Sequence, residues 1–149
     1  MNYNTKSKSG FTIIEVVLVL AIAGLIFLIV FLAVPALQRS QRDTQRRSDA
    51  GRLLTYLSNY QANNRGVLPT GTAQAAFVSG YVKELTSPST GAAYGIVWGA
   101  TAPTRNTTTE TLQISVGSKC QGETIVTGTG RNVAVRTLLE GGGYYCTDQ

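Results

Sequence analysis

The hydrophobic and polar positions divide the chain into three stretches. The first is an apolar run from Val16 to Leu37 that contains no charged residue. As a helix rising about 1.5 Å per residue, this run would extend about 33 Å, which is enough to cross the hydrocarbon core of a bilayer. A short polar leader, residues 1–10, precedes it. The pattern therefore predicts a leader followed by a membrane-spanning helix over residues 11–37.

The second stretch, residues 38–64, is polar but keeps a helical period. Leu53 and Leu57 belong to an apolar stripe with steps of three and four residues, which is typical of an amphipathic helix. Gly66 is suited to the left-handed position that ends many helices. We therefore expect one helix over residues 11–63 that is apolar all round in its first half and one-sided in its second half.

The third stretch, residues 65–149, predicts a small globular domain. Residues 73–85 fit a short helix or an irregular loop equally well. Strands are predicted at residues 94–98, 112–116, 124–127 and 132–138. Of these, 112–116 has the alternation of a half-buried strand, and the last two flank the turn residues 128–131 and predict a hairpin. The expected fold class is α+β, with the long N-terminal helix packed on a small antiparallel β-sheet domain.

Composition narrows the chemistry of this domain. The 149 residues carry a formal net charge of +5, two cysteines and no histidine. Histidine is the most frequent general base and metal ligand, and no nucleophile-elbow, phosphate-loop or C-x-x-C motif is present. We therefore predict a protein that is not an enzyme and that needs no cofactor and no metal. The mild positive charge is compatible with anionic lipid, nucleic acid or solubility alone.

The residues around the start of the apolar run form a specific motif. A basic leader ends in Gly10, Phe11 follows, and Glu15 comes four residues later at the head of an unbroken apolar helix. This arrangement resembles the class III signal of type IV pilins. The resemblance implies that a prepilin peptidase cuts between Gly10 and Phe11 and methylates the new N-terminal Phe11. It covers roughly the first 40 to 60 residues.

Two helix-unfriendly residues in the apolar run also bear on the resemblance. Gly24 falls where such pilins often carry a glycine, whereas Pro35 lies about one helical turn later than the usual family proline. Both residues are also common in ordinary transmembrane helices. By resemblance, the helix is expected to unwind between Gly24 and Pro35 in an assembled filament, so both are candidate assembly residues.

Glu15 poses a physical problem, because an ionised carboxylate in hydrocarbon costs about 2.5–3.5 kcal/mol. One solution is a side chain that reaches the aqueous interface. The other uses the predicted cut, after which Phe11 carries a free α-amino cation on the same helix face as Glu15. We expect the Phe11 amine of another copy to pair with Glu15 and to set the register of assembly.

Arg39, Arg42 and Arg46 lie on one face of the predicted helix, just beyond the apolar run. Contact with anionic phospholipid head groups is the expected role, and ion pairs with neighbouring subunits are an alternative. DNA binding needs only positive charge and reach, but no aromatic residues alternate with these arginines. One rule opposes an exported C-terminal domain, since more arginines follow the apolar run than precede it and positive-inside logic would keep them in the cytoplasm.

Cys120 and Cys146 are expected to form a disulfide in an exported domain, with two free thiols as the alternative. The resemblance supports the bond, because many pilins close a C-terminal region in this way. Such a bond would contribute about 3–4 kcal/mol to a small domain.

Together these features predict a structural subunit of a type IV pilus. The resemblance implies a precursor in the cytoplasmic membrane, then an extracellular filament made of copies of this chain, with a prepilin peptidase, an assembly platform protein and an ATPase as partners. A pseudopilin of a secretion or competence machine is the first alternative. An uncleaved, monomeric binding module anchored by its signal is the second.

Overall fold

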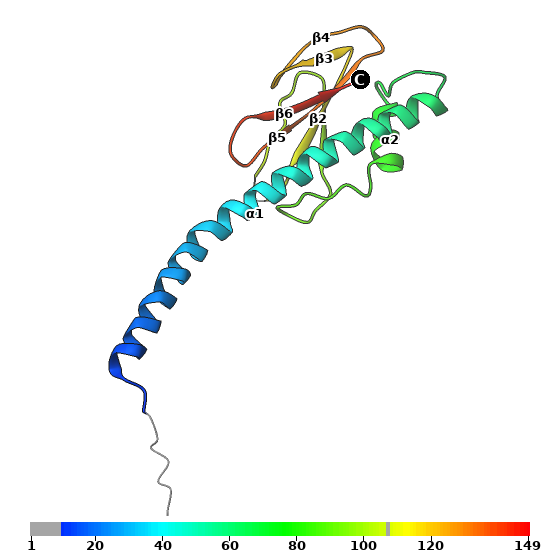
Figure 1. Cartoon of the computed structure of the whole chain (residues 1–149). Coiled ribbons are helices and arrows are strands. Elements are labelled where there is room, and N and C mark those ends of the chain that lie inside the picture. Colours follow the sequence, from blue (N-terminus) through cyan, green and yellow to red (C-terminus); the bar gives the residue numbers. More distant parts are fainter. Residues whose placement is uncertain (1–9, 107) are drawn as a thin grey trace, which may run out of the picture. The chain divides into compact units, whose positions relative to one another are not determined.

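The computed structural model describes residues 10–106 and 108–149, so the predicted leader lies outside the described residues except for Gly10. The chain divides into two compact units, Met1–Gln38 and Arg39–Gln149, and helix α1 (Ile13–Asn63) contributes to both (Figure 1). The other elements belong to the second unit. They are α2 (Ala73–Tyr81), β1 (Gly95–Trp98), β2 (Thr111–Val116), β3 (Ser118–Gln121), β4 (Thr124–Thr127), β5 (Val133–Leu138) and β6 (Tyr144–Asp148).

In the first unit, α1 is an apolar helix whose side chains are exposed. Its most apolar 18-residue window has a mean hydropathy of 3.3, and none of that window is buried. Among the described residues, α1 is the one helix long and apolar enough to cross a membrane. Exposed apolar surface on this scale marks a site of contact with lipid or with other proteins. The helix remains continuous through Gly24 and Pro35.

In the second unit, α1 buries one face against the domain core. Ala50, Leu53 and Leu57 are fully buried, which confirms the predicted amphipathic stripe. α2 forms in the segment that fitted helix or loop equally well, and it contributes Phe77 to the same core. The core is completed by Leu68, Val82, Leu85, Tyr94, Leu112, Ile114, Val133 and Val135. The long helix packed on a β-sheet confirms the expected α+β class.

Four strands form the main sheet, in the order β1-β2-β5-β6. β1 and β2 run parallel, and the other pairs are antiparallel. β2 was expected to be half-buried, but Gln113 and Ser115 on its second face are also covered, with 1% and 7% exposure. On this face Ser115 hydrogen-bonds Ser118 of β3 at 2.9 Å, and Gln113 accepts a hydrogen bond from Arg136 Nε at 2.8 Å.

The predicted hairpin between residues 124–127 and 132–138 is wrong. β4 pairs with β3, with Cys120 opposite Ile125, whereas β5 pairs with β2 and β6. The turn itself exists, because the Asn132 N–H donates to the Thr129 carbonyl at 2.9 Å and Asn132 Oδ1 accepts from the Thr129 N–H at 2.8 Å. This turn connects the two sheets instead of closing a hairpin within one.

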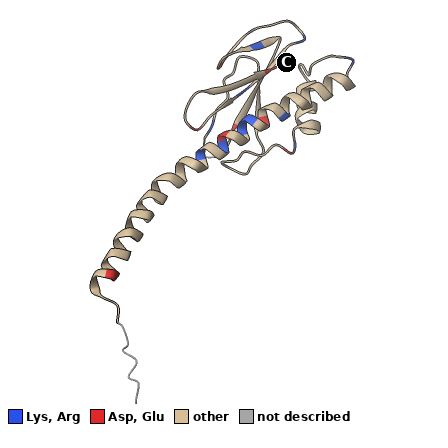
Figure 2. Ribbon diagram, in the orientation of Figure 1, with Lys and Arg blue, Asp and Glu red and all other residues tan. Residues whose placement is uncertain are grey.

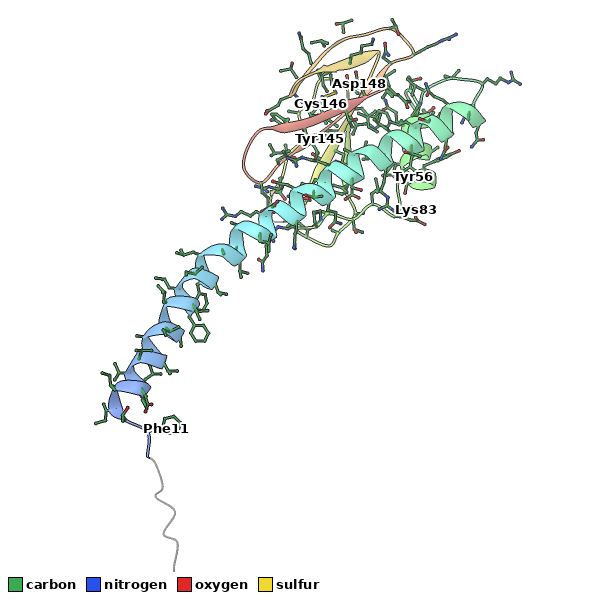
Figure 3. The ribbon with its side chains drawn as sticks, in the orientation of Figure 1. Phe11, Tyr56, Lys83, Tyr145, Cys146 and Asp148 are labelled. Carbon is green, nitrogen blue, oxygen red and sulfur yellow. A yellow bond between two sulfur atoms is a disulfide. The ribbon has the colours of Figure 1, made fainter. Side chains whose placement is uncertain are left out.

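A disulfide joins the two sheets. Cys120 on β3 is bonded to Cys146 on β6, with a Cα–Cα distance of 5.7 Å. The Cys120 N–H also donates to Asp148 Oδ2 at 2.9 Å; Figure 3 labels Cys146 and Asp148 on β6. The predicted bond is therefore confirmed, and the β3–β4 hairpin is tied to the edge strand of the main sheet.

Candidate processing and assembly site

Helix α1 begins with a reciprocal pair of side chains. Glu15 Oε2 accepts hydrogen bonds from the Thr12 N–H at 2.9 Å and from the Thr12 hydroxyl at 2.8 Å. In return, the Glu15 N–H lies 3.4 Å from Thr12 Oγ1. This is a capping box, in which a Thr and a Glu three residues apart satisfy N–H groups that the first turn leaves without helical partners. Glu15 therefore has a partner within its own chain.

The capping box uses only one of the two carboxylate oxygens of Glu15. Among the described residues, none donates a hydrogen bond to Glu15 Oε1. Glu15 is exposed. Figure 2 shows one acidic position near the start of α1, followed by a long part of the helix without charge. A second donor can therefore approach this carboxylate without displacing Thr12.

The predicted cleavage point is accessible. Gly10 and Phe11 are both exposed, and the side chain of Phe11 is 90% exposed. Phe11, labelled in Figure 3, lines a shallow apolar cleft of about 320 Å³ together with Glu15 and Val19. The residue that a cut after Gly10 would make N-terminal therefore lies beside the carboxylate.

A protein-family model described as the prokaryotic N-terminal methylation motif matches residues 5–31. This segment contains Gly10, Phe11 and Glu15. Over these residues the chain is similar to the class III leader of type IV pilins. The motif supports a pilin-like or pseudopilin protein with a structural role, and with the apolar helix it suits a membrane-anchored precursor. Neither the curated proteins nor the solved structures contain a match to this chain.

Gly24 and Pro35, the other two predicted assembly residues, lie inside α1. A Cβ built on Gly24 would have no atom within 4 Å beyond its own helix backbone, so nothing within the chain requires glycine there. Pro35 removes one helical hydrogen bond without ending the helix. Close approach of another helix at Gly24, and unwinding between the two residues in a filament, remain predictions.

Arg46 occupies the centre of a buried ion-pair network in the second unit. Its side chain is 1% exposed and donates to Asp43 at 2.8 Å, to Glu110 at 2.7 Å and to Glu140 at 3.1 Å. A fourth hydrogen bond goes to Ser89. The expectation that Arg46 contacts lipid head groups is therefore corrected, because its charge is buried and already paired.

Arg42 and Arg39 differ from Arg46 in their exposure and in their partners. Arg42 is half-buried and holds Glu140 through two hydrogen bonds, at 2.5 and 2.9 Å. The Arg42 hydrogen bonds, with help from Arg46, outweigh the effect of burial and lower the pKa of Glu140 to about 2. Arg39 is exposed and forms no ion pair with a described residue. Of the three arginines, Arg39 is thus the most available to an external anion.

Two parts of these sites were missed by sequence reasoning. The capping box had a readable signal, since Thr12 and Glu15 follow the S/T-x-x-E pattern at the head of an apolar run. The partners of Arg46 had none, because Glu110 and Glu140 lie 64 and 94 residues away along the chain. Within residues 10–106 and 108–149, no group of three or more His, Cys, Asp or Glu side chains could hold a metal ion.

Proposed function

We propose that this chain is a structural subunit of a type IV pilus. It is cut after Gly10 by a prepilin peptidase, methylated on Phe11, and held in the cytoplasmic membrane by the apolar part of α1. An assembly platform protein and its ATPase then transfer it into an extracellular filament of identical copies. The methylation motif over residues 5–31, followed by an exposed apolar helix, is the observation that carries the proposal.

Transfer of the apolar part of α1 out of water, into lipid or against other helices, is energetically favourable. Its large apolar side chains between Phe11 and Leu37 are 43–90% exposed in the isolated chain. Burying one such side chain contributes about 1.5–3 kcal/mol, so a few of them offset the entropy lost on association. In the membrane, lipid supplies this burial; in a filament, the helices of other copies supply it.

Glu15 and the freed amine of Phe11 give the assembly its register. Within one chain, Glu15 Oε2 accepts the Thr12 hydrogen bonds and leaves Oε1 for a second partner. The Phe11 amine of a neighbouring copy is a cation that methylation does not remove. In the dry core of a filament, an unpaired Glu15 or an unpaired amine costs several kcal/mol, so a subunit out of register is rejected.

A pair of variants separates this role from helix capping. Glu15→Gln removes the charge but keeps a residue that the capping box accepts, whereas Thr12→Ala removes the cap but keeps the charge. We expect Glu15→Gln to be processed normally and to abolish filaments, and Thr12→Ala to form filaments. The measurement is the yield of sheared filaments relative to the membrane pool. Filaments at normal yield from Glu15→Gln would refute the pairing.

Mass spectrometry of the mature N-terminus tests the proposal as a whole. A chain that begins with methylated Phe11 supports it, and a chain that begins with Met1 indicates an uncleaved anchored module. Electron microscopy then separates a pilus from a pseudopilin machine. Loss of thin surface filaments on deletion supports the pilus, while a secretion or transformation defect in cells without filaments supports the pseudopilin.

A further inference from the structure

A cleft of about 600 Å³ lies in the second unit, where α1 enters it. Its lining comes from four separate parts of the chain: α1, the loop before β1, the loop between β1 and β2, and the loop after β5. The lining residues are Arg39, Arg42, Ser89, Arg105, Asn106 and Glu140. Three of them carry a guanidinium group, and one carries a carboxylate.

The carboxylate of this cleft is already shared among several cations. Glu140 lies 2.5 Å from Arg42, 3.1 Å from the buried Arg46 and 3.7 Å from Arg105. Arg42 is committed to it through two hydrogen bonds, whereas Arg105 is held only at the longer distance. Arg39 adds a charge with no carboxylate near it among the described residues. The cleft therefore has an excess of positive charge and guanidinium donors to spare.

The place of the cleft along the chain suggests what fills it. Arg39 comes two residues after Leu37, the last residue of the apolar run. When that run spans a bilayer, the residues that follow it lie at the level of the lipid head groups. Guanidinium groups bind phosphate with paired, charge-assisted hydrogen bonds.

We infer that this cleft binds the phosphate of an anionic phospholipid head group while the chain is anchored in the membrane, with Arg39 and Arg105 as the principal contacts. The inference rests on the membrane-anchored state of the proposed function and not on filament assembly. Arg105 enters the site from the loop before β2, and Arg46, which shares a helix face with Arg39 and Arg42, is excluded from it by burial.

A second copy of the chain is a poorer occupant, because it has few carboxylates to offer. Seven of the eight acidic residues already contact a donor in their own chain. These are Glu15, Asp43, Asp49, Glu110, Glu123, Glu140 and Asp148. The oxygen left open on one of them, Glu15 Oε1, is assigned by the proposed function to the Phe11 amine of a neighbouring copy. Among contacts between described residues, Glu84 alone has no polar partner for its side chain. Anionic lipid supplies negative charge without breaking any of these contacts.

Native mass spectrometry of the full chain, released from detergent and titrated with lipid, tests the inference. Phosphatidylglycerol is compared with phosphatidylcholine of the same acyl chains. The test variant is Arg39→Gln/Arg105→Gln. The matched control is Arg65→Gln/Arg131→Gln, which removes two exposed arginines that line a different cleft.

Each arginine near an anionic lipid contributes about fivefold in affinity, so two contribute roughly thirtyfold. We expect the wild-type chain and the control to prefer phosphatidylglycerol by about this factor, and the test variant to lose the preference. Equal loss in both variants would show general charge attraction and overturn the site, as would a wild-type chain with no preference. Retention of the disulfide and of helical circular dichroism confirms that the variants are folded.

Two further measurements identify the molecule that binds in the cleft. Soluble glycerol phosphate should bind the wild-type chain only at millimolar concentration, and tight binding of this anion would refute the lipid assignment. If the test variant instead loses chain dimers and keeps its lipid preference, the cleft binds a second copy and the inference is wrong. Cleavage after Gly10 and filament yield are scored separately, so loss of lipid preference in a chain that still assembles leaves the proposed function intact.

Discussion

Replacing Arg46 with methionine tests the buried network of the second unit. The substitution keeps a long, flexible side chain and removes the positive charge. Glu110, which is 3% exposed, would keep only the hydrogen bond from the Ser87 hydroxyl at 2.6 Å. Glu140 would keep Arg42. One buried carboxylate would thus lose its counter-charge.

The size of the effect follows from this loss. Breaking a buried ion pair by removing one partner costs about 3–5 kcal/mol, because the remaining charge is left uncompensated. Arg46 Nε is a buried nitrogen without a hydrogen-bond partner among the described residues, so the native network is incompletely satisfied. For this reason we expect the lower end, a loss of about 3 kcal/mol in the free energy of unfolding. That is a large share of the stability of a small domain.

Urea unfolding of the full chain in mild detergent measures the loss. The single tryptophan, Trp98, lies in the second unit and packs edge-to-face against Phe77 with ring centroids 6.1 Å apart, so its fluorescence follows this domain. Arg47→Met is the control, because Arg47 is exposed and forms no ion pair within the described part of the chain; its guanidinium carbon lies 5.9 Å from the centre of the Tyr145 ring. This substitution should cost less than about 0.5 kcal/mol. Equal effects from the two variants would refute the reasoning. Adding Glu110→Gln to Arg46→Met should recover part of the loss.

Three further predictions use the same unfolding measurement. The pKa of Glu140 is lowered from its usual value of 4.5 to about 2, so the stability that this carboxylate contributes is present above pH 4.5 and is lost as the pH falls toward 2. Glu140→Gln should therefore reduce the loss of stability between these pH values, and an unchanged pH dependence would contradict the assignment. Replacing both Cys120 and Cys146 with serine should lower the free energy of unfolding by about 3–4 kcal/mol, because the disulfide closes a loop with a sequence separation of 26. A wild-type chain whose stability does not change on addition of a reductant would contradict this prediction. Leu57→Ala, at a fully buried site, should cost about 2–5 kcal/mol, whereas Thr55→Ala on the exposed face of the same helix should have little effect. Similar losses from both would mean that α1 does not pack as described.

The long helix could be predicted because its signals are local. Hydrophobicity over residues 11–37 and the stripe through Leu53 and Leu57 specify where α1 lies and which face it buries. The cleavage motif is also local, and the family match falls on the same residues. The cysteine pair was predictable for another reason, since two cysteines allow only one intrachain bond.

Strand pairing could not be predicted, because it depends on residues far apart along the chain. The turn at residues 128–131 was correctly located, but a turn does not state which strands it joins. β3 was not predicted, because Ser118–Gln121 has no alternation of apolar and polar residues. This strand is held in place by the disulfide and by its pairing with β4. The partners of Arg46 were hidden for the same reason, since periodicity identifies a helix face but not what covers it.

The capping box at the head of α1 has a consequence for maturation. Thr12 and Glu15 both lie on the C-terminal side of Gly10, so removal of the leader would take away none of the donors and acceptors that close the first turn. The precursor and the trimmed chain would then share one helix terminus, and the new positive charge would arrive next to a carboxylate that is already oriented. No refolding step would separate proteolysis from the moment at which a neighbour can be engaged.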